Sequence, residues 1–301
     1  MRILGQVDSA GDRSLRGIAM MTASALSNQV GAALGARAFD AIGPVGVVAV
    51  RQWVAAVVLM PVARPPLRRL TWSQWWPVLL LAAVFGCMNL SVYVAIDRLG
   101  LALAITLEFL GPLAVALAGS RSRRDLLLAV AAAVGVYVLV LPGGSSDYLG
   151  LAIGAIGGAC WAAYILLNRV AGERLPGLQA PAVASALCAV AYLPLLLMVL
   201  GDDRATVAPL LYAIAAGVLA SVVPYAVDLV ALRFVPAQFF SVFMSIHPVL
   251  AALVGLALLG EYLALHEWVG IAVVVLTNAA AVSTRAAPVA QPGTSREELV
   301  R

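Results

Sequence analysis

Long apolar blocks separated by short polar stretches run through the chain from residue 15 to residue 284. A helix needs about 20 mostly apolar residues to cross the hydrocarbon core of a membrane, and each block is close to that length. We therefore expect an all-α integral membrane protein with ten transmembrane helices, at about residues 15–36, 43–62, 74–96, 100–118, 125–141, 149–168, 181–200, 207–231, 236–259 and 264–284.

The composition supports this interpretation. Of 301 residues, 63% are hydrophobic and 11% charged, and the mean hydropathy is +0.99. Soluble domains carry about 25% charged residues. Every basic residue is an arginine, and the arginines form small clusters between the apolar blocks rather than one stripe. We therefore expect the lipid bilayer as a partner and no nucleic acid.

The arginines also predict an orientation. If the N-terminus lies inside, 15 of the 19 arginines fall on the inner side, Arg51 lies within a span, and only Arg37, Arg98 and Arg204 fall outside. Loops on the cytoplasmic side of membrane proteins carry such an excess of basic residues. Both termini are therefore predicted to face the cytoplasm.

A weak internal repeat divides the chain. A shift of 136 residues brings Pro112 onto Pro248 and Gly119 onto Gly255. Each half has five predicted spans, so the second half is inverted relative to the first. Inverted repeats are typical of secondary transporters, which bind substrate at the repeat interface. The predicted organisation is a cytoplasmic N-terminal tail (1–14), a first five-helix repeat (15–141), a second five-helix repeat (149–284) and a disordered cytoplasmic tail (286–301).

Three of the charged residues within predicted spans are candidates for the transport pathway. Glu108 is a lone acid, four residues before Pro112. A charge at bilayer depth costs roughly 2.5–3.5 kcal/mol, so intramembrane acids mark transport pathways. We expect Glu108 to carry a proton or to contact a substrate amine, or alternatively to be a structural carboxylate that is protonated or paired with Arg51. Asp228 is expected in the same pathway, unless it is hydrated at the inner interface. Arg51 either binds a substrate carboxylate, neutralises an acid on another helix or extends to the outer surface.

Uncharged polar and aromatic residues at helical spacings predict a small cavity. His247 stands directly before Pro248, and it either relays protons or forms a structural hydrogen bond. Ser221, Tyr225 and Asp228 are spaced to share one helix face. The remaining residues that we expect to line the cavity are Asn28, Asn89, Tyr93, Trp161 and Tyr164. For each of these five residues the alternative is a hydrogen bond between helices.

The motifs of ATP-driven transport and of zinc hydrolysis do not occur in the sequence. It contains neither a G-x-x-x-x-G-K-[ST] loop nor H-E-x-x-H. The three cysteines lie inside apolar blocks without C-x-x-C spacing. We therefore expect no cofactor, no metal site and no enzymatic activity.

The stretch YVAIDRLGLALAITLEFLGPLAVAL at 93–117 carries a more specific signal. With WAAYILLNRVAG from Trp161 and VPYAVDLVALRFVPAQFFSVFMSIHPVLAALVGLALLGE at 223–261, it resembles the drug/metabolite transporter superfamily, whose ten-helix members consist of two EamA-type repeats. Within it, the chain is similar to threonine/homoserine exporter-like permeases over nearly its full length. Related sequences usually carry a glutamate at the position of His247, so substrate charge preference or proton coupling is expected to differ here.

The resemblance implies a permease of the bacterial cytoplasmic membrane. Such a protein exports amino acids such as threonine and homoserine, or related small metabolites, by alternating access. Protons are the implied coupling ion, and Glu108 is the family-type carboxylate. The alternative is a carrier of the same fold for cationic drugs or other metabolites, in which Asp228 and aromatic rings would hold the cation. The sequence leaves the oligomeric state open.

Overall fold

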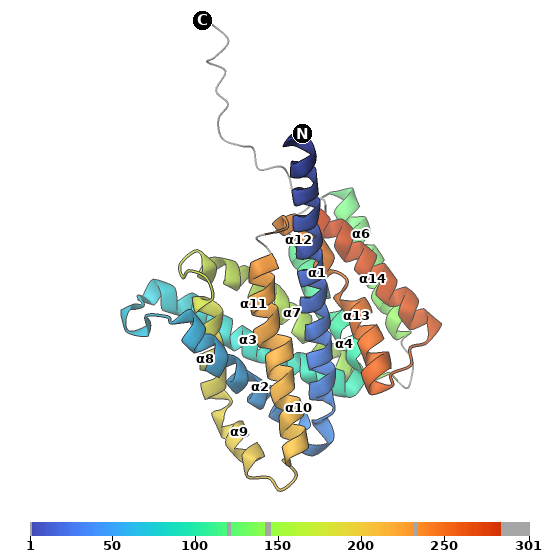
Figure 1. The fold of residues 1–301 in the computed structure, drawn as a ribbon. Coiled ribbons are helices and arrows are strands. Elements are labelled where there is room, and N and C mark those ends of the chain that lie inside the picture. The colour runs from blue at the N-terminus through green and yellow to red at the C-terminus, as the bar shows by residue number, and fades with distance from the viewer. Residues whose placement is uncertain (1, 119–121, 142–145, 232–233, 284–301) are drawn as a thin grey trace, which may run out of the picture.

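The computed structural model describes residues 2–118, 122–141, 146–231 and 234–283, and the regular elements in these ranges are all helical (Figure 1). The predicted tail from residue 286 lies outside the described residues, whereas residues 2–14 continue the first helix. The elements are α1 (Arg2–Ala36), α2 (Phe39–Ala63), a 3₁₀ turn η1 (Leu67–Arg69), α3 (Trp72–Leu99), α4 (Leu101–Glu108), α5 (Leu110–Leu117), α6 (Arg123–Val140), α7 (Tyr148–Gly172), α8 (Gln179–Ala191), α9 (Leu193–Leu200), α10 (Val207–Gly217), a π-helical turn η2 (Val218–Val222), α11 (Val223–Ala231), α12 (Ala237–Met244), α13 (His247–Val254), a second π-helical turn η3 (Gly255–Leu259) and α14 (Leu265–Ser283).

The ten apolar blocks are helical over most of their length, but not all of them are long, uninterrupted spans. By length and composition, six helical stretches of the described chain can cross a membrane, and a seventh is obtained if α8 and α9, bent by 55°, form one span. The fourth block, α4–α5, covers only Leu101–Leu117. The all-helical membrane fold is therefore confirmed, while the count of ten spans stays a prediction.

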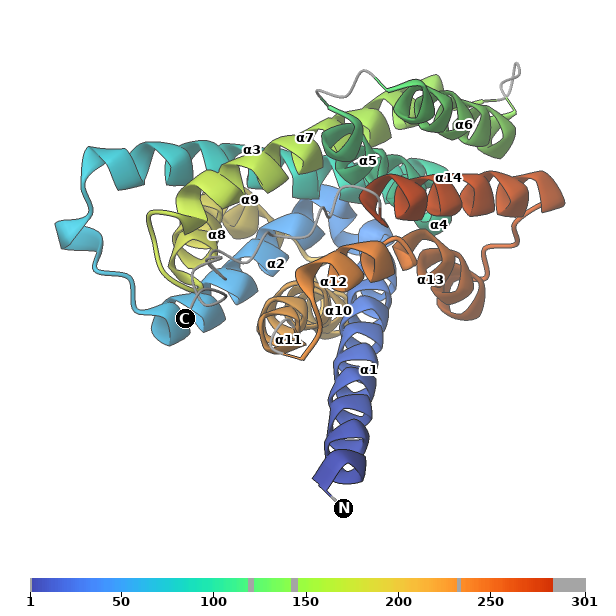
Figure 2. The ribbon, with the colours of Figure 1, turned by 90° about the horizontal axis from the view of Figure 1, so that it is seen from above.

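The helices cross one another in a single bundle (Figures 1 and 2). Helix α1 packs mainly against α10, η2 and α11, and α7 packs mainly against α3. Helix α2 contacts α8, and α6 lies along α14. The start of α1 and the end of α14 lie at the same end of the bundle, at the top of Figure 1.

Two helices are interrupted near the middle of the bundle. Phe109 separates α4 from α5, and Ser245 and Ile246 separate α12 from α13. A proline follows each break, Pro112 and Pro248. Proline lacks an amide proton and cannot continue the helical hydrogen bonding, so a carbonyl group one turn upstream loses its partner. Interrupted helices are tolerated at membrane depth where they line a protein-enclosed or water-filled space.

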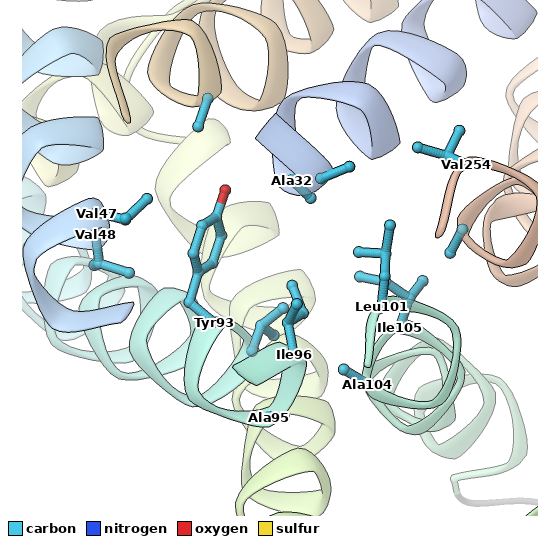
Figure 3. Packing of buried hydrophobic residues seen from close by; sticks show 14 of the residues in the cluster. Ala32, Val47, Val48, Tyr93, Ala95, Ile96, Leu101, Ala104, Ile105 and Val254 are labelled. Atoms are coloured by element: carbon cyan, nitrogen blue, oxygen red, sulfur yellow. The ribbon is translucent and has the colours of Figure 1, made fainter. Parts of the chain in front are cut away.

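The end of the bundle opposite the start of α1 is filled with apolar side chains. We call it the closed end; α1, α3 and η3 end here, and α2, α4 and α14 begin here. Figure 3 shows Tyr93 between α1 and α2, with its hydroxyl directed away from its own helix. The buried cluster comprises Ala32, Ala33, Ala38, Val47, Val48, Val50, Val92, Tyr93, Ala95, Ile96, Leu101, Ala104, Ile105, Phe109, Ala213, Ala216, Ala251 and Val254.

Two polar contacts join distant segments at the closed end. Both carboxylate oxygens of Glu261, in the α13–α14 connection, accept the Leu101 amide at 3.0 Å and thus cap α4. The Arg37 guanidinium, just after α1, donates to the Leu258 carbonyl in η3 at 2.7 Å. Free amide groups at a helix start and free carbonyl groups in a π turn need such partners. These contacts connect α1 and α4 to the segment after α13.

Close packing of α7 against α4 predicts the effect of one small substitution. A Cβ atom added at Gly158 would stand 2.8 Å from the Leu107 carbonyl oxygen, so the helices would have to separate. We expect Gly158→Ala to lower the free energy of unfolding by about 1–3 kcal/mol, the usual cost of overpacking. Thermal unfolding of the purified protein in detergent measures this loss.

Gly172 provides the matched control for this prediction. It is the last residue of the same helix, and an added Cβ would meet no atom within 4 Å. Gly172→Ala should leave the melting temperature unchanged or slightly raised. Equal losses in the two variants would contradict the packing interpretation.

Candidate functional site

A cavity of about 210 Å³ lies between the two interrupted helices and their neighbours. All ten residues predicted for the site line it, although they come from seven helical segments. Its walls are formed by Asn28, Gln29, Ala32, Arg51, Phe85, Met88, Asn89, Val92, Tyr93, Ile105, Glu108, Phe109, Trp161, Tyr164, Ala220, Ser221, Pro224, Tyr225, Asp228, Met244 and His247. The mixture of aromatic walls with a few polar groups is typical of small-molecule sites.

Glu108 is the last residue of α4, directly before the break at Phe109. Its side chain is half-buried and lines the cavity. Within the described part of the chain, Glu108 has no ion pair or side-chain hydrogen bond. The helix break therefore presents a carboxylate that is available to a ligand or a proton.

Arg51 is held in place by α10–α11. Its Nε donates to Ser221 Oγ at 2.9 Å, and its Nη2 donates to the Ala220 carbonyl at 2.8 Å. Ala220 lies in η2, where the π turn disturbs the regular hydrogen bonding and exposes a carbonyl. The guanidinium carbon lies 5.1 Å from the centre of the Tyr93 ring, a cation–π distance. Arg51 keeps further N–H donors for a ligand, and it alone carries a positive charge among the described cavity residues.

Asp228 and three aromatic rings form another part of the wall. Ser24 of α1 interacts with the Asp228 carboxylate, and Oδ1 of that carboxylate is buried without a hydrogen-bond partner in the described structure. Phe85 stacks on Tyr164 at 5.9 Å and lies 6.4 Å from the ring of Tyr225. This part of the cavity combines an acid with aromatic faces.

His247 begins α13, and it is only 6% exposed. Its Nδ1 lies 3.0 Å from Nε2 of Gln29 in α1. The imidazole stacks on Phe109 at 5.2 Å, and Phe109 makes an edge contact of 4.4 Å with Trp161. The residue at the break in the first interrupted helix thus packs on the first residue after the break in the second.

Asn28 and Asn89 also line the cavity. Asn89 Nδ2 donates to the Phe85 carbonyl one turn earlier in α3, at 2.8 Å. Its amide group is therefore used partly within its own helix, whereas the alternative interpretation expected a hydrogen bond between helices. No hydrogen bond of the Asn28 side chain is found among the described residues.

Gln29 and Phe109 were not among the predicted site residues. The sequence signal for Gln29 was its position beside Asn28 within an apolar span. Consecutive residues of a helix point about 100° apart, so a prediction based on one narrow helix face selects Asn28 without Gln29. The cavity is wide enough to reach both faces of α1.

The described residues contain no group of three or more His, Cys, Asp or Glu side chains placed to hold a metal ion. The contacts around the cavity are charges, hydrogen bonds and aromatic ring contacts. Their chemistry suits reversible binding of a small polar molecule.

Comparison with known proteins identifies the family. A model of the EamA-like transporter family matches residues 148–282. Threonine/homoserine exporter RhtA from Salmonella typhimurium strain LT2 is 36% identical over 241 residues, which are 79% of this chain and 81% of the exporter. The chain belongs to the EamA-like transporter family. The exporter of the same name from Escherichia coli strain K12 is 34% identical over 252 residues, 82% of this chain and 84% of the relative.

A solved structure described as "Crystal structure of protein" has a similar fold. Its TM-score is 0.57 at 18% sequence identity, and the match covers 91% of this chain and 97% of the other. The family and the apolar helices together make this EamA-like protein a multi-pass membrane protein and a transporter. The predicted family resemblance is confirmed.

Proposed function

We propose that the protein is a proton-coupled exporter of amino acids such as threonine and homoserine, or of related small metabolites, in the bacterial cytoplasmic membrane. The observation that carries the proposal is the Glu108 carboxylate, which ends an interrupted helix and lines the central cavity without a partner in the described structure. The names of the relatives supply the substrate class. The activity is transport rather than catalysis of a reaction.

The charges around the cavity match a zwitterion. Glu108 binds the substrate ammonium group, and Arg51, anchored on Ser221, binds the carboxylate. A proton arriving at Glu108 neutralises it and releases the ammonium group. Loss of the proton restores the site, so proton and substrate bind Glu108 in alternation.

The packing supports two inverted five-helix repeats (15–141 and 149–284) and ten spans. The second and fifth helices of one half contact their counterparts in the other, as α2 contacts α8 and α6 contacts α14. The first helix of each half packs on the third helix of the other. A two-fold axis between inverted repeats produces such reciprocal pairs. The start of α1 and the end of α14 lie at the same end of the bundle (Figure 1). The arginine-rich loops favour this end as the inner side, so in this proposal both termini face the cytoplasm.

The position of the cavity suggests which side is sealed. The apolar cluster around Tyr93 fills the closed end, and in this orientation it separates the cavity from the outside. Asp228, on the cavity wall, is three residues from the end of α11 near the opposite side. This arrangement supports the proposal of a state closed to the outside. Rocking of the repeats would open the closed end and give alternating access.

The Glu261 cap should help to keep the closed end shut. A helix cap contributes about 0.5–2 kcal/mol, so Glu261→Ala should raise the population open to the outside by about 2- to 30-fold. The parent for this experiment carries Ala32→Cys and has its three native cysteines replaced. We measure how fast a membrane-impermeant thiol reagent labels Cys at position 32 on intact cells, with and without Glu261→Ala. Ala32 lies in both the closed-end cluster and the cavity wall.

Glu267 supplies a control at the same end of the bundle. Its Oε2 accepts the Ala264 amide at 2.6 Å, three residues away, and so caps its own helix without joining distant segments. Labelling in Glu267→Ala should equal that of the parent. If Glu261→Ala leaves labelling at the parent rate, the cap has no role in closing this end.

Transport by the purified protein tests the proposed function. In proteoliposomes with an imposed pH gradient, we expect saturable movement of L-threonine in exchange for protons. Homoserine should compete, and a cationic dye such as ethidium should not. Absence of threonine transport by a folded protein would contradict the proposal.

A same-fold carrier for organic cations is the second candidate. Asp228 next to the stacked Phe85 and Tyr164 rings provides a carboxylate and aromatic faces, which together bind organic cations. In the transport experiment, this function predicts ethidium movement that neither threonine nor homoserine inhibits.

A further inference from the structure

The hydrogen bond between Gln29 and His247 fixes where the imidazole carries its proton. The Gln29 amide is placed with its nitrogen toward the ring, and an amide nitrogen can only donate, so in this arrangement Nδ1 of His247 accepts from Gln29 Nε2 at 3.0 Å. A ring whose Nδ1 accepts a hydrogen bond is neutral and carries its proton on Nε2. His247 is therefore an uncharged donor on the cavity wall.

That donor is left without a partner. Nε2 of His247 is buried and forms no hydrogen bond within the described structure. Phe109 stacks on the ring at 5.2 Å, so the imidazole cannot turn easily to find another acceptor. Buried polar groups in proteins are nearly always paired, and an orphaned donor in a cavity calls for an acceptor from a ligand.

The other polar groups of the cavity decide which acceptor this is. Glu108 suits the ammonium group of an amino acid, and Arg51 suits its carboxylate, because each pairs with the opposite charge. The uncharged Nε2–H of His247 then remains for an uncharged oxygen. A side-chain hydroxyl is such a group.

We propose that His247 Nε2–H donates a hydrogen bond to the side-chain hydroxyl of a hydroxy amino acid, and that Gln29 is the positioning residue that holds the required tautomer. This inference rests on the proposed function and adds the group by which the substrate is selected. A site with a buried donor for a substrate hydroxyl rejects an analogue that lacks it, because the donor stays unpaired.

The test compares binding of L-threonine with that of L-2-aminobutyrate, which has the same carbon chain without the hydroxyl. His247→Phe keeps an aromatic ring against Phe109 and removes the donor. Gln29→Met keeps a long side chain and removes the hydrogen bond to Nδ1. Affinities of both compounds are measured by equilibrium binding to the purified full chain and its variants.

We expect the parent protein to bind threonine about tenfold more tightly than 2-aminobutyrate, because one good hydrogen bond contributes about that much to affinity. His247→Phe should abolish this preference, because it lowers the affinity for threonine more than the affinity for 2-aminobutyrate. Gln29→Met should reduce the preference in the same direction. Because Gln29 acts through His247, the double variant should behave like His247→Phe alone.

Gln52→Met is the control, since Gln52 is buried in α2 but does not line the cavity. It should retain the full preference. Gln29→Met leaves the aromatic stack untouched and keeps the proposal testable if His247→Phe does not fold.

A purely structural role of His247 and Gln29 predicts that the variants lose affinity for both compounds equally, or that the effects of the two substitutions add. Either result would overturn the inference. If the parent protein binds threonine but does not prefer it over 2-aminobutyrate, the inference is overturned and the proposed function stands. If the folded parent binds neither compound, the proposed function fails as well.

Discussion

Replacing Glu108 by glutamine is expected to reduce proton-driven threonine transport by about 100-fold or more. Removing one partner of a buried, hydrogen-bonded charge pair costs about 2–5 kcal/mol, which is about 30- to 5,000-fold in binding. Glutamine has nearly the same shape, but it can neither attract the ammonium group by charge nor exchange a proton. The measurement is threonine flux into proteoliposomes under an imposed pH gradient, with and without the substitution.

Glu173→Gln is the matched control for this substitution. Glu173 follows α7, its side chain is 67% exposed, and it forms an ion pair of 3.7 Å with Arg169. Such exposed pairs contribute little. The control should transport at the parent rate, and Glu108→Gln should remain folded with an unchanged gel-filtration profile. Undiminished proton-coupled flux in Glu108→Gln would contradict the proposed role of the carboxylate.

Replacing Arg51 by methionine should produce the second large effect, a loss of threonine affinity of about 30-fold or more. The substitution removes the positive charge opposite Glu108. It also leaves Ser221 Oγ and the Ala220 carbonyl without their partner. Equilibrium binding of labelled threonine to the purified protein measures the affinity, and thermal unfolding measures the structural part of the effect.

Arg51→Lys separates charge from geometry. Lysine keeps the positive charge but cannot donate to Ser221 and Ala220 through a planar fork. We therefore expect an affinity between that of the parent and that of Arg51→Met. Equal affinities for all three proteins would show that Arg51 serves only to hold η2.

Much of the site could be predicted from the sequence because membrane helices restrict polar residues so strongly. A charged side chain such as Glu108 or Asp228 is costly in lipid, so each had to point toward the protein interior. Pro112 and Pro248 similarly indicate helix interruptions, because proline cannot continue the helical hydrogen bonding. The structure brings these acids and both helix breaks around one cavity.

Other features depend on contacts between distant residues. Gln29 bonds to His247 across 218 residues of chain, and Glu261 caps Leu101 across 160. The π turns η2 and η3 accept hydrogen bonds from Arg51 in α2 and from Arg37 just after α1. Local periodicity carries no information on such pairs. The 55° bend between α8 and α9 was likewise absent from the sequence prediction, although Pro194 follows it closely.

The pH dependence of threonine binding to the purified protein tests most directly whether proton and substrate compete for Glu108. Competition predicts that, below the pH at which the carboxyl group becomes protonated, the dissociation constant for threonine rises by about tenfold for each unit by which the pH falls. Glu108→Gln should bind threonine weakly at every pH, without this dependence. A dissociation constant that stays constant across the acidic range in the parent protein would contradict the account.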